Sequence, residues 1–216
     1  MPTRSFNSFS LRFAICGLTV LTLLILCAPV MAHHPFGGDA PVNILEGFLS
    51  GIGHPVIGLD HLAFVITAGL LATTFNRGWF IPIVFVLASL TGTIIHLLNF
   101  NLPMTEFLIS LSVLGFGLLL AMKDSLPEAA VIVLAGMAGL FHGYAYGESV
   151  IGAGMPSLIA YLIGFSTIQM VISGGVYLVA KKLVSSDDNV KPLSLRFAGF
   201  ILSGVGVTLL SNLLLG

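Results

Sequence analysis

The feature that most constrains this fold is a succession of apolar segments, each about 20 residues long, separated by short polar breaks. A helix rises about 1.5 Å per residue, so a segment of this length spans the roughly 30 Å hydrocarbon core of a bilayer. The segments lie at about 44–72, 79–99, 104–122, 127–148, 157–180 and 194–214. The sequence therefore predicts an all-α polytopic membrane protein whose transporter domain, residues 44–216, has six transmembrane helices.

The composition supports this class. Hydrophobic residues make up 56% of the chain and charged residues only 8%, whereas a soluble domain carries roughly 25% charged residues. The net charge of −1 offers no basic surface, so we expect a lipid bilayer and no nucleic acid as partner. Both cysteines, Cys16 and Cys27, precede the first predicted helix of the domain. If that region is removed, the mature chain has neither a disulfide nor a thiolate metal site.

Residues 1–32 have the pattern of a secretory signal peptide. The basic residues Arg4 and Arg12 precede an apolar core at 13–28, and small residues before and at Ala32 offer a cleavage point. An uncleaved first helix is the alternative. Cleavage would leave residues 33–43 as an extracytoplasmic N-terminal segment.

A pair of histidines would then begin the mature chain. His33 and His34 would stand next to the new α-amine, and this group of nitrogens could capture a metal ion. A polar tail without metal affinity is an equally good interpretation. Both interpretations place the pair outside the membrane.

Basic residues give the orientation, because they concentrate in cytoplasmic loops. With an exported N-terminus, alternate loops face the cytoplasm. These loops hold every basic residue after the signal, namely Arg77, Lys123, Lys181, Lys182, Lys191 and Arg196. The other loops hold none. We therefore expect the mature N-terminus and the C-terminus to be extracytoplasmic, in the inner (plasma) membrane of a bacterium.

Four of the six histidines fall inside predicted helices, where ionisable side chains are costly and mark an ion pathway or a site. They are His54, His61, His96 and His142. Neutral imidazole binds Ni²⁺, Co²⁺, Zn²⁺ and Cu²⁺ well, and a carboxylate can complete the ligand set. The structural alternative is that each histidine only hydrogen-bonds a neighbouring helix.

The stretch from His54 to His61 contains two of these histidines and a carboxylate. A regular helix would put both imidazoles on nearly the same face, with Asp60 about 100° away from His61. Pro55 and Gly58 lie between them, so we expect a helix that is tilted, kinked or broken here. A break would also expose backbone carbonyls as further ligands.

The predicted orientation also gives an estimate of depth. It places four residues in the outer halves of their helices, namely His54, His96, His142 and Glu148. We expect them to line a cavity that opens to the outside. Asp60 and His61 lie nearer the middle of the first helix and would form a second position for the ion, deeper in the membrane.

Two motifs carry a resemblance to a known family. One is His-x5-Asp-His, from His54 to His61, and the other is Phe-His-Gly-x-Ala-x-Gly, from Phe141 to Gly147, followed by Glu148. In these motifs, and in its signal and span pattern, the chain resembles the HupE/UreJ nickel permeases, which are associated with hydrogenase and urease maturation. Two departures lie in the second motif. Many members have a histidine where this chain has Tyr146, and in many the acid falls where this chain has Ser149.

The resemblance implies import of Ni²⁺, with Co²⁺ as a second candidate. The functional positions it implies are His54, Asp60, His61, His142 and, with the departure noted, Glu148. His96 rests on the depth argument alone. The metal would be cargo, so no tightly bound cofactor is expected, and metallochaperones of hydrogenase or urease maturation are candidate partners.

The mechanism implied is a secondary or channel-like importer. The sequence has no Walker motif, and the membrane potential favours cation entry by about 2.3 kcal/mol per charge per 100 mV. An intramembrane zinc hydrolase that uses the same His/Asp cluster is the alternative from another class. A third is an accessory membrane subunit without transport of its own.

Overall fold

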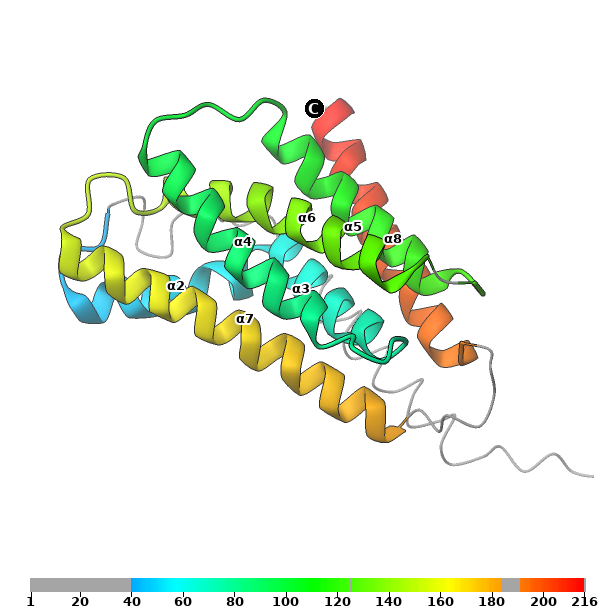
Figure 1. Ribbon diagram of the computed structural model, residues 1–216. Helices are drawn as coiled ribbons and strands as arrows, with labels where there is room; N and C mark the ends of the chain where they lie inside the picture. Colours follow the sequence, from blue (N-terminus) through cyan, green and yellow to red (C-terminus); the bar gives the residue numbers. More distant parts are fainter. Residues whose placement is uncertain (1–39, 125, 184–190, 216) are drawn as a thin grey trace, which may run out of the picture. The chain divides into compact units, whose positions relative to one another are not determined.

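The structure is a computed structural model that describes residues 40–124, 126–183 and 191–215. All regular structure in these residues is helical, which confirms the all-α prediction (Figure 1). The helices are α2 (Ile44–Ile57), α3 (Leu59–Ala72), α4 (Phe80–Leu97), α5 (Thr105–Ala121), α6 (Glu128–Glu148), α7 (Met155–Leu183) and α8 (Leu193–Leu215). The predicted signal peptide, 1–32, and the pair His33 and His34 lie outside the described residues.

Every predicted apolar segment coincides with helix, and the first one forms two helices. Among the described residues, α4, α6, α7 and α8 are each long and apolar enough to cross a membrane. The pair α2 and α3 counts as a fifth span if it crosses as one unit. Helix α5 is apolar but has 17 residues, or about 25 Å at the usual rise. Four or five spans are thus supported, and the sixth stays a prediction.

The break between α2 and α3 lies at Gly58, where the two helix axes differ by 77°. Gly58 has an extended ψ of 107°, which ends the helical path. A Cβ at this position would lie 2.7 Å from Cδ2 of His61 and 3.1 Å from Oδ1 of Asp60, so only glycine lets the next turn fold back so closely. The expectation of a distorted first helix is confirmed.

Three helix pairs pack closely, namely α4 with α6, α5 with α8, and α2 with α7 (Figure 1). Small residues permit the approach. A Cβ added to Gly143 of α6 would collide with the backbone of Ser89 on α4, and one added to Gly51 of α2 would collide with the backbone of Tyr161 on α7. These contacts fix where α6 and α7 lie around the helix break.

An aromatic core supports the region next to the break. The ring of Phe64 on α3 lies 4.5 Å from that of Phe85 on α4 and 4.6 Å from that of Phe116 on α5, measured between centroids. All three rings are buried. The imidazole of His142 lies directly on this core, 4.8 Å from the Phe64 ring. The core therefore holds α3, α4, α5 and α6 together around a histidine.

Candidate metal site

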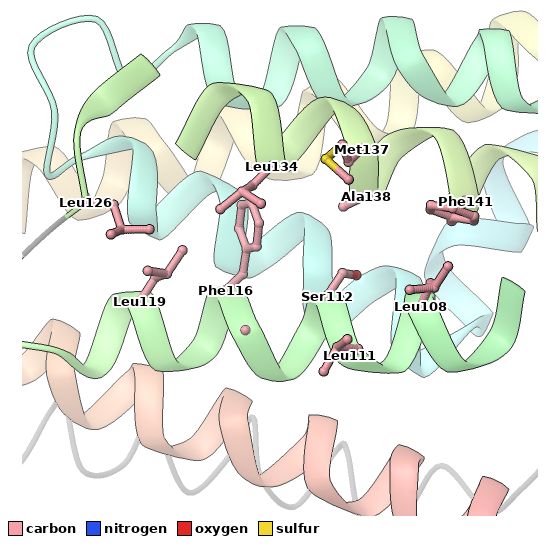
Figure 2. A pocket seen from close by; sticks show the side chains of 11 residues that line it. Leu108, Leu111, Ser112, Phe116, Leu119, Leu126, Leu134, Met137, Ala138 and Phe141 are labelled. Carbon is pink, nitrogen blue, oxygen red and sulfur yellow. The ribbon is translucent and has the colours of Figure 1, made fainter. Parts of the chain in front are cut away.

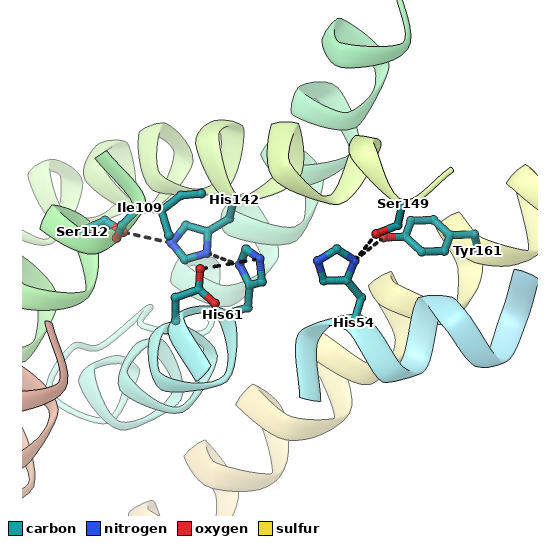
Figure 3. Close-up of polar contacts among 8 residues, drawn as sticks. His54, His61, Ile109, Ser112, His142, Ser149 and Tyr161 are labelled. Atoms are coloured by element: carbon teal, nitrogen blue, oxygen red, sulfur yellow. Dashed lines mark hydrogen bonds and ion pairs between the residues drawn. The ribbon is translucent and has the colours of Figure 1, made fainter. Parts of the chain in front are cut away.

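Three buried histidines from three helices converge beside the helix break (Figure 3). They are His54 on α2, His61 on α3 and His142 on α6, exposed by 1%, 3% and 0%. The ring centroids of His54 and His61 are 5.4 Å apart, and those of His61 and His142 are 5.0 Å apart. We call these three residues the histidine cluster. It unites the two motifs that the sequence holds far apart.

His61 and His142 contact each other directly. Their Nδ1 atoms are 2.8 Å apart, a hydrogen-bond distance. On the far side of His142, Nε2 lies 3.0 Å from Oγ of Ser112 on α5, and this hydroxyl donates to the carbonyl of Ile109 at 2.7 Å. A continuous polar contact therefore runs from α3 through α6 to α5.

His54 is held on the opposite side of the cluster. Its Nδ1 lies 2.8 Å from Oγ of Ser149, just after α6, and 3.0 Å from the hydroxyl of Tyr161 on α7. The Tyr161 hydroxyl donates to the carbonyl of Tyr146 at 2.9 Å. In Figure 3 the two hydroxyls lie together on one side of the His54 ring, away from His61.

Tyr146 packs against two members of the cluster. Its ring centroid lies 5.0 Å from that of His54 and 4.4 Å from that of His61. The side chain is fully buried, and within the described residues its hydroxyl has no hydrogen-bond partner. Tyr146 thus takes a place in contact with the cluster, at the position where many relatives are expected to have a histidine.

Asp60 adjoins the cluster from the partly exposed side. Its Oδ1 accepts a hydrogen bond from the backbone N–H of His61 at 2.8 Å, and its Oδ2 lies 3.9 Å from Nε2 of His61. Asp60 and His61 are consecutive residues in the first turn of α3, so their separation of about 100° around the helix remains. The carboxylate reaches His61 because the first backbone N–H groups of a helix have no partner within it and are open to a side-chain acceptor. Nevertheless, within residues 40–124, 126–183 and 191–215 no three His, Cys, Asp or Glu side chains are grouped closely enough to hold a metal ion.

Two expected site residues lie apart from the cluster. His96 packs on Tyr144, with ring centroids 4.4 Å apart, and its Nδ1 is buried without a partner among the described residues. Glu148 is exposed, whereas the next residue, Ser149, is buried against His54. The chain therefore turns a hydroxyl, and not the adjacent carboxylate, toward the cluster.

The expectation that the site residues form two separate layers, an outer one and a deeper one, is wrong for the three histidines. Depth along the helices placed His54 and His142 in an outer level and His61 in a deeper one, but His61 contacts His142 and lies beside His54. The reason is the 77° bend, because α3 turns toward α6 and does not continue inward along the axis of α2.

Sequence reasoning missed three residues that contact the cluster, namely Ser112, Ser149 and Tyr161. Each is a hydroxyl-bearing residue in or next to an apolar segment, and such residues commonly hydrogen-bond between membrane helices. That chemistry identifies them as candidates for polar contacts. It does not indicate which histidine each one contacts.

An apolar hollow of about 370 Å³ lies between α5 and α6 (Figure 2). Its lining is Leu108, Leu111, Ser112, Gly115, Phe116, Leu119, Leu126, Leu134, Met137, Ala138 and Phe141. Because this lining contains no histidine, the hollow is not the histidine-lined cavity expected from the sequence. Ser112 belongs both to the hollow and to the contacts of His142.

Comparison with known proteins gives the same family as the resemblance of the two motifs. The family model for HupE / UreJ protein matches residues 21–209. Protein HupE of Rhizobium leguminosarum bv. viciae is 31% identical over 153 residues, which make up 70% of this chain and 76% of that protein. No solved structure matches the chain significantly. The match over most of the sequence, together with the apolar helices, shows that this multi-pass membrane protein belongs to the HupE/UreJ family.

Proposed function

We propose that this protein imports a divalent transition metal ion, Ni²⁺ in the first place and Co²⁺ in the second, from outside the cell into the cytoplasm. The observation that carries the proposal is the convergence of His54, His61 and His142, three buried imidazoles from three helices. Imidazole is a preferred ligand of both ions. The chain belongs to the HupE/UreJ family, and this family is associated with nickel uptake, which supports the same cargo.

The helix break supports cation binding. Helix α2 ends beside His54, and the C-terminal end of a helix carries a partial negative charge that attracts cations. Discontinuous helices bind transported ions in this way in other membrane carriers. Asp60, in the first turn of α3, adds a full negative charge next to His61.

The proposed route begins at the extracytoplasmic side. A hydrated ion exchanges part of its water for the imidazoles of the histidine cluster and the Asp60 carboxylate, and it leaves toward the cytoplasm when the helices rearrange. His33 and His34 would present the ion to the mouth of the route. Glu148 is not included in this site, because its side chain is exposed and Ser149 takes the position against His54.

Transport would be secondary or channel-like. The inside-negative potential contributes about 2.3 kcal/mol per charge per 100 mV, so a divalent cation enters without ATP. We place the protein in the inner (plasma) membrane of a bacterium with both mature termini outside. Metallochaperones of hydrogenase or urease maturation would receive the ion in the cytoplasm.

Uptake of radioactive nickel by cells that express the chain tests this function. We expect accumulation above that of cells without the chain, competition by cobalt stronger than by zinc, and loss of accumulation in His54→Ala. Equal accumulation by His54→Ala at equal membrane abundance would contradict the proposed site. Hydrolysis of a lipid or peptide by the purified protein, with no uptake, would favour the enzyme alternative.

A further inference from the structure

We infer that Gln169 and Ser166 of α7 line the inner part of the ion's route, between the histidine cluster and the cytoplasm. There, their side-chain oxygens accept hydrogen bonds from the water shell of a divalent cation. This role rests on the proposed function, because it concerns the same cargo and the same direction of transport. It adds two residues that act after the ion has left the histidine cluster and that control how fast it reaches the cytoplasm.

A row of buried side chains runs along α7 at intervals of four residues. Side chains at this spacing lie on one face of a helix. Each member is exposed by 2% or less, and all but one are polar: Ser157, Tyr161, Phe165, Gln169 and Ser173. The helix as a whole is apolar enough to span a membrane. A polar row on the buried face of such a helix is a candidate lining for a polar route.

The outer part of this row already belongs to the candidate site. The hydroxyl of Tyr161 lies 3.0 Å from Nδ1 of His54. The next member, Phe165, packs against Tyr146, whose ring touches the histidine cluster, and the centroids of these two rings are 5.1 Å apart. Gln169 follows about one turn further along α7. The row therefore leads from the histidine cluster toward the end of α7 that we expect in the cytoplasm.

Gln169 has a side-chain oxygen without a partner. The side chain is fully buried, and its amide nitrogen donates to the carbonyl of Phe165 at 3.1 Å. Because a carbonyl oxygen only accepts, the nitrogen and not the oxygen of the amide must face it. Within the part of the chain that the structure describes, Oε1 of Gln169 accepts no hydrogen bond. The buried face of α7 therefore offers a strong acceptor that no protein group uses.

The hydroxyl of Ser166 is a second oxygen of this kind. It is buried and has no hydrogen-bond partner among residues 40–124, 126–183 and 191–215. Residues three apart are neighbours on a helix surface, so Ser166 lies beside Gln169. Other buried hydroxyls in these helices donate to the carbonyl four residues earlier, namely those of Thr67, Ser89, Thr93, Ser173 and Ser203. Ser166 makes no such bond, so two unpartnered oxygens stand next to each other.

These oxygens suit the water shell of a cation. Lipid cannot hydrogen-bond a polar group, and buried polar groups that lack a protein partner are ordinarily satisfied by water or an ion. The water molecules around a cation direct their hydrogens outward, so a passage for a hydrated cation needs acceptors. Gln169 offers an acceptor only, and Ser166 offers a hydroxyl that can also accept. Neutral oxygens bind such an ion loosely, which suits passage and release.

Helix α3 covers the inner end of the row. A Cβ added to Gly69 of α3 would lie 2.5 Å from the carbonyl oxygen of Ser173, so the two backbones touch there. The same helix begins with Asp60 and His61 at the histidine cluster. The route between α3 and α7 is therefore closed beyond Gln169 in this structure. Release of the ion requires these two helices to separate at the contact between Gly69 and Ser173.

Nickel uptake by liposomes that contain the full chain tests the role of Gln169. Gln169→Met removes the oxygen and nearly preserves the length of the side chain. We expect uptake to be about 10- to 100-fold slower, the effect of losing one hydrogen bond to a charged group. The same variant should bind nickel at equilibrium as tightly as the wild type, because the histidine cluster is unchanged. A residue that only supported the fold would not separate rate from affinity in this way.

Two variants of the same helix are matched controls. Thr167→Val removes a hydroxyl from the exposed face of α7. Tyr177→Phe removes a hydroxyl that accepts from the exposed Lys181 at 2.8 Å, beyond the end of the buried row. Both should transport nickel as the wild type does. Wild-type uptake by Gln169→Met at equal membrane abundance would overturn the inference while leaving nickel transport intact, whereas a wild type without uptake would overturn the proposed function.

Thiol accessibility tests the same lining without nickel. The chain has two cysteines, both before residue 32, so replacing them by alanine leaves an introduced cysteine as the only thiol. Water-soluble thiol reagents attack the thiolate, which does not form in apolar surroundings. We expect Gln169→Cys and Ser166→Cys to react from the cytoplasmic side, with Lys181→Cys as the reactive reference and Thr167→Cys as the unreactive, lipid-facing one. Reaction of Gln169→Cys and Ser166→Cys no faster than that of Thr167→Cys would overturn the inference.

Discussion

Nδ1 of His61 lies 2.8 Å from Nδ1 of His142, although 81 residues separate the two in the chain. A hydrogen bond between two like nitrogens requires that one carries a hydrogen and the other a lone pair. The contact therefore joins α3 to α6 and also fixes how the two rings are protonated relative to each other.

Gly58→Ala should weaken nickel binding. The new Cβ would lie 2.7 Å from Cδ2 of His61 and 3.1 Å from Oδ1 of Asp60, so both side chains must move. We expect a loss of about 10- to 100-fold in affinity, comparable to that of disturbing the surroundings of a metal ligand. Isothermal titration with Ni²⁺ measures it. Gly175→Ala, whose added Cβ meets nothing within 4 Å, is the control, and an equal affinity in both variants would contradict the role of the break.

Ser149→Ala and Glu148→Gln should differ, although the residues are neighbours. Ser149 is buried 2.8 Å from Nδ1 of His54, whereas Glu148 is exposed. We expect Ser149→Ala to weaken nickel binding by roughly 10-fold through its contact with a ligand, and Glu148→Gln to leave it unchanged. The same titration compares them. A larger loss in Glu148→Gln would restore that carboxylate to the site.

His96→Ala should bind nickel normally. Its ring packs on Tyr144, 4.4 Å between centroids, and Gly147 lies against its Cβ, outside the histidine cluster. Removing it takes away packing between α4 and α6, so a lower unfolding temperature is expected with an unchanged metal stoichiometry and affinity. Nickel equilibrium dialysis beside thermal unfolding separates the two effects. Loss of a bound ion would show that His96 is a ligand after all.

Gly143→Ala should destabilise the protein. The added Cβ would collide with the backbone of Ser89, so α4 and α6 would have to separate, and overpacking of this kind costs about 1–3 kcal/mol. Because Gly143 follows His142, the shift should also disturb the contact with His61. Thermal unfolding in detergent measures the change, and Gly174→Ala, where an added Cβ meets nothing within 4 Å, should unfold as the wild type does. Identical unfolding temperatures would argue against the close α4–α6 contact.

The helices and the break could be predicted from the sequence, because apolar length, Pro55 and Gly58 act locally. The spacing of His54 and His61 predicts a shared face but a separation of about 10 Å along a regular helix, and the bend between α2 and α3 brings their ring centroids to 5.4 Å. The pairing of His61 with His142 could not be predicted, because a depth estimate locates a residue along a helix but not around the other helices. The bend at Gly58 changes which neighbour α3 meets, and the contacts of Ser112 and Tyr161 depend on that packing.

The most direct test is nickel entry into liposomes that contain only the purified protein, without ATP and with an inside-negative potassium diffusion potential. The proposed transport requires that nickel accumulates in the vesicles, that dissipating the potential slows this accumulation, and that His54→Ala and His61→Ala abolish it while Tyr177→Phe does not. Vesicles with correctly inserted protein that take up no nickel, or that take it up equally well with His54→Ala and His61→Ala, would contradict it.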